Sequence, residues 1–156
     1  MKIVKNNDEI LNYAGNFGTF SKEGETIKYS ETRGDYVELN FTGTKVRFYT
    51  HTNAWRGITN IYIDDIKIDA IDTYSQEEIM DVLVYESEEL SYGSHTIKIE
   101  ISGEKNEKSN AAKIAIYRFE IDDEKPSEGE TNLDLTELKA IVEELKSIME
   151  ERGCVC

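Results

Sequence analysis

The amino-acid sequence predicts an all-β fold, an antiparallel jelly-roll β-sandwich, followed by a C-terminal amphipathic helix of the coiled-coil type. Apolar residues alternate with polar ones from Thr26 to Asp122, which is typical of strands with one buried face. Turn-forming residues separate these short runs, and the apolar spacing lengthens to a helical one near the C-terminus. The sequence therefore predicts a sandwich over 1–122, an acidic linker over 123–132 and an oligomerisation helix over 133–156.

The predicted strands follow one another at short intervals. The first clear run has apolar residues at Val37, Leu39 and Phe41, and a second run with Val46 and Phe48 follows directly, so these two runs are expected to form a hairpin. The later runs have the same alternation, with apolar pairs or triplets at Ile61 and Ile63, at Val82 and Val84, and at Ile97, Ile99 and Ile101. Many short strands at this spacing favour a sandwich or barrel over a parallel sheet.

The last predicted strand changes parity. Ile114 and Ile116 lie on one face, but Phe119 and Ile121 lie on the other, and a slip of one residue moves every side chain across the sheet. A β-bulge near Tyr117-Arg118 explains the change. The alternative is a strand whose middle is buried on both faces.

The charge of the chain excludes several classes of partner. Its formal net charge is −14, from 32 acidic and 18 basic residues, and no basic stripe is present to neutralise phosphates. Nucleic acid is therefore not an expected partner. Membrane insertion is not expected either, because no apolar run approaches the ~20 residues that span a bilayer. No signal peptide is visible, and an extracellular or virion-associated location is expected.

The C-terminal segment has the pattern of a helix that associates with copies of itself. Its apolar stripe has the spacing of a coiled coil and consists of Leu138, Ile141, Val142, Leu145, Ile148 and Met149. A homo-oligomer follows, with a trimer favoured and a tetramer possible, although the stripe could instead dock onto its own sandwich. Cys154 and Cys156 follow the helix and suit interchain disulfides; a metal-binding pair and free thiols are the alternatives.

Catalytic groups are scarce, so the chain is not expected to be an enzyme. His51 and His95 are the only histidines, and no nucleophile elbow, Cys–His pair or phosphate-binding loop occurs. Carboxylates are abundant, but among 32 acidic residues pairs arise by chance. No catalytic residue is therefore assigned.

One loop is the main candidate for ligand binding. The segment His51–Gly57 lies between two predicted strands and contains Trp55, the only Trp. An aromatic ring can cover the C–H face of a sugar, while Arg56 and Asn53 supply donors and acceptors for hydroxyls. That combination suits a neutral sugar. The alternative is that Trp55 closes the end of the sandwich as part of the core.

Residues of other loops are expected at the same end. The full set of predicted glycan-binding residues is His51, Asn53, Trp55, Arg56, Tyr13, Tyr74 and Asn106. No cofactor is expected, but a structural calcium is possible, because clustered carboxylate oxygens bind calcium and the chain has Asp64, Asp65, Asp69 and Asp72. A hairpin turn explains Asp64-Asp65 equally well.

The order of motifs along residues 10–122 resembles a known family. The motifs are Tyr13-Ala14-Gly15, Gly34–Leu39, Phe41–Thr44, Arg56–Ile58, Ile61–Asp64, His95–Ile97 and Gly103–Asn106. Together they are similar to galactose-binding-domain-like jelly rolls, which occur as non-catalytic carbohydrate-binding modules beside bacterial glycoside hydrolases and in phage tail or fibre proteins. The chain departs from the family pattern with Asp64-Asp65 in place of Asp-Gly, and with Tyr117 in place of an Asp.

The resemblance implies a jelly roll whose loops at one end often bind glycans, sometimes with a structural calcium. With the predicted bundle it leads to one hypothesis, a carbohydrate-binding module for adhesion or receptor binding, made multivalent by its tail. Its partner would be a glycan or a bacterial-surface polysaccharide. The alternative is a structural virion or cell-surface fibre or decoration subunit, whose sandwich contacts protein.

Overall fold

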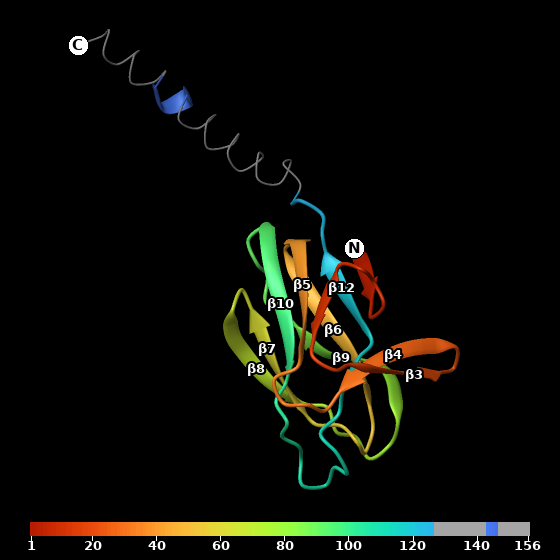
Figure 1. Cartoon of the computed structure of the whole chain (residues 1–156). Coiled ribbons are helices and arrows are strands. Elements are labelled where there is room, and N and C mark those ends of the chain that lie inside the picture. Colours follow the sequence, from red (N-terminus) through yellow and green to blue (C-terminus); the bar gives the residue numbers. More distant parts are fainter. Residues whose placement is uncertain (127–142, 147–156) are drawn as a thin grey trace, which may run out of the picture. The chain divides into compact units, whose positions relative to one another are not determined.

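The computed structural model describes residues 1–126 and 143–146. Met1–Glu124 form one compact unit, which contains all the strands (Figure 1). Residues 143–146 are helical, and Leu145 within them is exposed. No helix in this part of the chain is long and apolar enough to cross a membrane. The other predicted tail residues lie outside the described residues: Leu138, Ile141, Val142, Ile148, Met149, Cys154 and Cys156.

The strands form three antiparallel sheets. The five-stranded sheet has the order β2-β5-β10-β7-β8, with β2 Leu11–Ala14, β5 Tyr36–Gly43, β10 Gly93–Ile101, β7 Ile58–Ile63 and β8 Ile66–Asp72. The four-stranded sheet has the order β1-β12-β6-β9, with β1 Lys2–Lys5, β12 Arg118–Asp122, β6 Lys45–Thr52 and β9 Ile79–Glu86. The third sheet has the order β11-β4-β3, with β11 Ile114–Ile116, β4 Glu25–Ser30 and β3 Gly18–Lys22.

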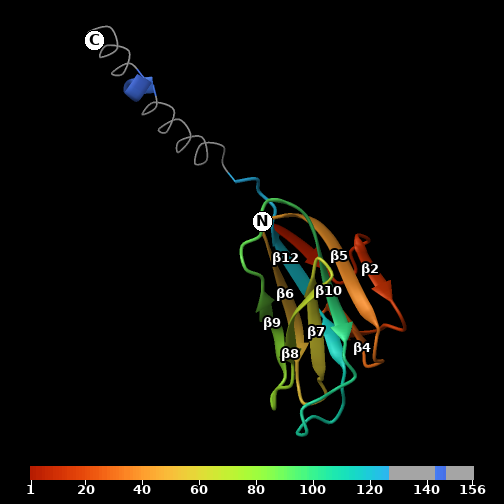
Figure 2. The same ribbon diagram turned by 90° about the vertical axis from the view of Figure 1, so that its left-hand side faces the viewer.

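The two larger sheets face each other as the layers of a sandwich, and the β3–β4 hairpin extends to one side (Figure 1; Figure 2). The predicted alternation is confirmed, because Leu39 of β5 and Ile99 of β10 are fully buried between the layers. From the opposite layer, Phe48 and Phe119 pack with their ring centroids 5.3 Å apart. Each such side chain contributes roughly 1.5–3 kcal/mol by burial, so the all-β sandwich is held by this one core.

The predicted hairpin of residues 36–48 is wrong. β5 and β6 are joined by a tight turn, but β5 lies in the five-stranded sheet and β6 in the four-stranded sheet. Gly43 makes this turn possible, since a Cβ there would lie 2.4 Å from the backbone oxygen of Asp122. Alternation reveals that a strand has a buried face, but it does not reveal which strand is its neighbour. This crossing between sheets is the connection expected of a jelly roll.

The last predicted strand is two strands. β11 pairs with β4 and β12 pairs with β6 and β1, so the chain changes sheets at Tyr117. Ile114, Ala115 and Ile116 are all buried, as the alternative of a doubly buried segment required. The parity change falls at Tyr117, whose backbone N–H donates to the Tyr49 carbonyl oxygen at 3.2 Å while Arg118 pairs with the same Tyr49. Two residues therefore oppose one, as the predicted bulge requires.

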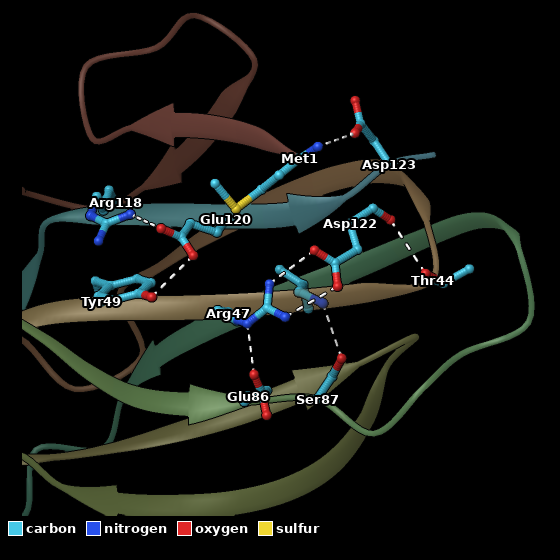
Figure 3. Close-up of polar contacts among 11 residues, drawn as sticks. Met1, Thr44, Arg47, Tyr49, Glu86, Ser87, Arg118, Glu120, Asp122 and Asp123 are labelled. Carbon is cyan, nitrogen blue, oxygen red and sulfur yellow. Dashed lines mark hydrogen bonds and ion pairs between the residues drawn. The ribbon is translucent and has the colours of Figure 1, made fainter. Parts of the chain in front are cut away.

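Charged side chains tie three strands together on the outer face of the four-stranded sheet (Figure 3). Arg47 on β6 donates from Nε to Glu86 on β9 at 2.6 Å, and from Nη1 and Nη2 to the Asp122 carboxylate on β12 at 3.0 and 3.1 Å. The hydrogen bonds from Arg47 hold the pKa of Asp122 below its usual range. The hydroxyl of Tyr49 donates to Glu120 at 3.0 Å, and the Arg118 guanidinium lies 3.7 Å from the Tyr49 ring centre. Because each of these contacts joins neighbouring strands, the cluster stabilises the sheet.

Candidate functional site

Two hollows lie at opposite ends of β6. The smaller, which we call the Trp55 cleft, has a volume of about 420 Å³. It is lined by Phe20, Lys22, Tyr29, His51, Asn53, Trp55, Arg56, Glu78 and Lys113. A volume in this range suits a small ligand such as one or two sugar rings. The chemistry of the cleft depends on how its loop, its aromatic rings and its charges are held.

A neighbouring loop fixes the position of the Trp55 loop. The backbone N–H of Trp55 donates to Oδ1 of Asn53 at 2.8 Å, which closes a local turn. From the 102–113 loop, the Ser109 hydroxyl lies 2.6 Å from the carbonyl oxygen of Arg56. Gly57 permits this approach, since a Cβ there would lie 2.7 Å from the Ala112 backbone. Trp55 therefore lies on a loop that these contacts hold in place.

His51 and Arg56 form the buried wall of the cleft. Both are almost fully buried, with 1% and 3% of their surface exposed. Arg56 donates from Nε to the His51 carbonyl oxygen at 2.8 Å, and its Nη2 lies 2.7 Å from Nδ1 of His51. Because a guanidinium can only donate, Nδ1 must accept and neutral His51 holds its proton on Nε2. Burial, and then the adjacent Arg56 charge, lower the pKa of His51.

Three aromatic rings supply apolar surface. Phe20 and Tyr29 pack edge to face, with their centroids 5.7 Å apart. Trp55 is 52% exposed, so the alternative that it closes the core is wrong. The ammonium of Lys113 lies 5.5 Å from the Tyr29 ring centre and 5.9 Å from that of Trp55. An exposed ring beside fixed donors can stack on a sugar face while the donors contact its hydroxyls.

Glu78 is the one acidic side chain among the residues that line the Trp55 cleft. It forms an ion pair with Lys22, and its Oε2 lies 3.2 Å from Nε2 of His51. The hydrogen bond from Lys22 holds the pKa of Glu78 below its usual range. Burial lowers the pKa of Arg56 to about 10, so the guanidinium stays charged at neutral pH. The cleft therefore carries three cations and one anion.

Four predicted site residues come together in this cleft: His51, Asn53, Trp55 and Arg56. Tyr74 lies beside them through a backbone bridge to Asn53. Asn106 is further along the same end, where its Nδ2 donates to Asp72 at 3.0 Å. Tyr13 lies elsewhere, on β2, with its hydroxyl donating to the Asn6 carbonyl oxygen at 2.6 Å; burial raises its pKa. Neither Tyr13 nor Asn106 lines the cleft.

The residues that the sequence did not identify come from distant segments: Phe20, Lys22, Tyr29, Glu78 and Lys113. The β3–β4 hairpin has a recognisable turn signal at Glu23-Gly24, where both residues have positive φ, 52° and 81°. That signal predicts a hairpin, but it does not indicate where the hairpin packs.

The aspartates proposed for calcium do not converge. Asp64 accepts from His95 and Thr96, and Asp72 accepts from Tyr74 and Asn106. Asp64 and Asp65 form the β7–β8 turn, with φ of 50° and 66°, as expected of a two-residue hairpin loop. Within residues 1–126 and 143–146 no three His, Cys, Asp or Glu side chains form a group suited to a metal.

The larger hollow, the His95 cleft, has a volume of about 600 Å³. Its lining is Lys2, Ile10, Asn40, Phe41, Thr42, Asp64, Tyr92, Ser94, His95, Thr96, Ile121 and Asp123. Both nitrogens of His95 face acceptors, with Nδ1 2.7 Å from Oδ2 of Asp64 and Nε2 2.7 Å from the Ser91 carbonyl oxygen. These contacts raise the pKa of His95. The charge of His95 is therefore paired with Asp64 within the chain.

Comparison with known proteins identifies the fold. No protein-family model matches the chain. In sequence the chain is similar to two enzymes of Flavonifractor plautii, an A type blood N-acetyl-alpha-D-galactosamine deacetylase (31% identity) and an A type blood alpha-D-galactosamine galactosaminidase (30% identity). Each match covers 74 residues, 47% of this chain and only 10% and 7% of the two enzymes.

The fold is also that of a solved binding module. The carbohydrate-binding module CBM36, determined in complex with calcium and xylotriose, superposes with a TM-score of 0.54 and 13% identity. The alignment covers 77% of this chain and 98% of that module. By its fold, the chain is an all-β sandwich of the kind found in carbohydrate-binding modules.

Proposed function

We propose that the chain is a non-catalytic carbohydrate-binding module and that the Trp55 cleft is its glycan site. The observation that carries this proposal is Trp55, half exposed on a braced loop above the buried donors of Arg56. Trp is highly buried on average in folded proteins, so an exposed ring flanked by oriented polar groups favours a site that stacks on a sugar. The binding ring and the hydrogen-bonding groups are preformed.

The relatives support binding rather than catalysis. The two enzymes are named for different reactions, a deacetylation and a glycoside cleavage, yet each shares a 74-residue stretch with this chain. A stretch common to different reactions in much longer enzymes is expected of an accessory module. Their names also make galactose-configured and galactosamine-containing glycans the first ligands to test, in line with a galactose-binding-like function.

We further propose that the tail makes this module multivalent. The apolar stripe at 138–149 and Cys154-Val155-Cys156 support a trimer, for which an adhesive role on a cell surface or a virion is the natural use. Linking several weak sites can raise avidity by ~10²–10⁴. Native mass measurement of the full chain, compared with a chain ending at Asp122, tests the proposal, and equal oligomeric states would contradict it.

The glycan site is tested by a matched pair of aromatic substitutions. Trp55→Ala should abolish binding on a glycan array, because stacking is lost while the loop contacts remain. Tyr92→Ala removes a similarly exposed ring, 41% exposed, from the His95 cleft and should leave binding unchanged. Undiminished binding by Trp55→Ala would remove the site, and no binding by the wild-type chain to any glycan would remove the function. Repeating the array with EDTA tests a role for calcium, which the CBM36 structure contains.

A further inference from the structure

We infer that the Trp55 cleft selects a sugar residue that carries a carboxylate, such as a uronic or sialic acid. The inference rests on the proposed function and differs from the expectation of a neutral sugar. It starts from the local charge. The chain as a whole has a formal charge of −14, yet the cleft is lined by three basic side chains and one acidic one.

Arg56 is the first cation of the cleft without an ion-pair partner among the described residues. Glu78 acts on it at longer range, where its charge raises the pKa of Arg56 against the larger effect of burial. Its guanidinium is almost fully buried, and its Nε and Nη2 contact only neutral acceptors of His51. Among the described residues no carboxylate forms an ion pair with it, and Nη1 has no acceptor. A buried charge without a direct ion-pair partner is costly. A planar guanidinium with a free nitrogen suits a carboxylate.

Lys113 is the second cation of the cleft without an ion-pair partner among the described residues. Within the part of the chain that the structure describes, it makes no ion pair, and its ammonium lies over the rings of Tyr29 and Trp55. Lys22 does not add to the excess, because Glu78 pairs with it. The cleft thus holds two cations without a direct ion pair, of which Lys113 lies over the Trp55 ring and Arg56 lies over the Phe20 ring.

His51, beside these cations, is neutral, so it adds neither a negative nor a positive charge to the cleft. His51 is held neutral, since its Nδ1 accepts from Arg56. Glu78 approaches His51 on the opposite nitrogen, Nε2. A ligand carboxylate would therefore complete the charge balance at Arg56 and Lys113 while its ring covers Trp55.

The test uses matched ligands on one array. Oligosaccharides with glucuronate, galacturonate or sialic acid are printed beside their carboxyl methyl esters, which keep the ring and lose the charge. We expect at least about tenfold weaker binding to the esters, because charge-assisted hydrogen bonds are the strong ones. Lys113→Met should remove most of this preference, whereas Lys67→Met, on β8 outside the cleft, should keep it.

The outcomes separate this inference from the proposed function. Equal, Trp55-dependent binding to acids and esters would overturn the carboxylate selectivity and leave the glycan site standing. An acid preference that Lys113→Met does not reduce would also overturn it, because the selecting charge would then lie elsewhere. No binding to any acidic or neutral glycan would overturn both.

Discussion

The two clefts at the ends of β6 both contain a histidine and an exposed aromatic ring, but their charges are arranged in opposite ways. In the Trp55 cleft a cation contacts His51, so the imidazole stays neutral, and Arg56 has no direct ion pair among the described residues, although Glu78 acts on it at longer range. In the His95 cleft two acceptors contact the imidazole, so both nitrogens must donate and the charge is matched by Asp64. The two histidines therefore differ in the charge of their neighbours: His51 contacts a cation, whereas His95 contacts an anion.

The largest expected loss of stability follows from replacing Arg56 in the buried wall of the Trp55 cleft. Arg56→Met should destabilise the fold by about 2–3 kcal/mol, because the buried His51 carbonyl loses its donor. It should also raise the pKa of His51, since the Arg56 charge helps to lower it. Urea unfolding and NMR titration measure the two effects. Lys113→Met is the control, because it removes a cleft cation without touching His51 and should change stability by less than about 0.5 kcal/mol. Equal stabilities of the two variants would contradict the assignment.

The second prediction removes the anion of the other cleft. Burial opposes the ionisation of Asp64, but its hydrogen bonds with His95 and the Thr96 amide outweigh burial and hold its pKa below its usual range. Asp64→Asn should cost about 0.5–1 kcal/mol near pH 5.5, a small value because the carboxylate is half exposed. Thermal melting at several pH values measures it.

The pH range of this loss follows from the signs of the shifts. The raised pKa of His95 gives stability that is fully present below about pH 6.5 and is lost as pH rises through the folded value. The lowered pKa of Asp64 gives stability that is lost as pH falls below about 4. A loss in Asp64→Asn that persists undiminished at pH 9 would show that the ion pair is not its cause.

Much of the fold could be predicted from the sequence, because alternation reports burial directly. Val37 and Ile97 lie in the core as expected. Alternation does not determine which strands are neighbours in a sheet, so the hairpin predicted for β5 and β6 is wrong. The same limit applies to the site. Residues 51–56 are local and were identified together, whereas Phe20 and Lys113 reach the cleft only through the packing of distant segments.

The smallest expected effect is the separation of the two histidine titrations in the wild-type chain. NMR should find that His95 titrates above pH 6.5, the ordinary histidine value, and that His51 titrates below it. Acidification through this range should therefore stabilise the contacts of His95 and destabilise those of His51. Protonated His51 would face Arg56 without an acceptor for Nδ1. His51→Gln and His95→Gln assign the two resonances. If His51 titrated above His95, the neutral tautomer would be wrong, and with it the unmatched cation on which carboxylate selection depends.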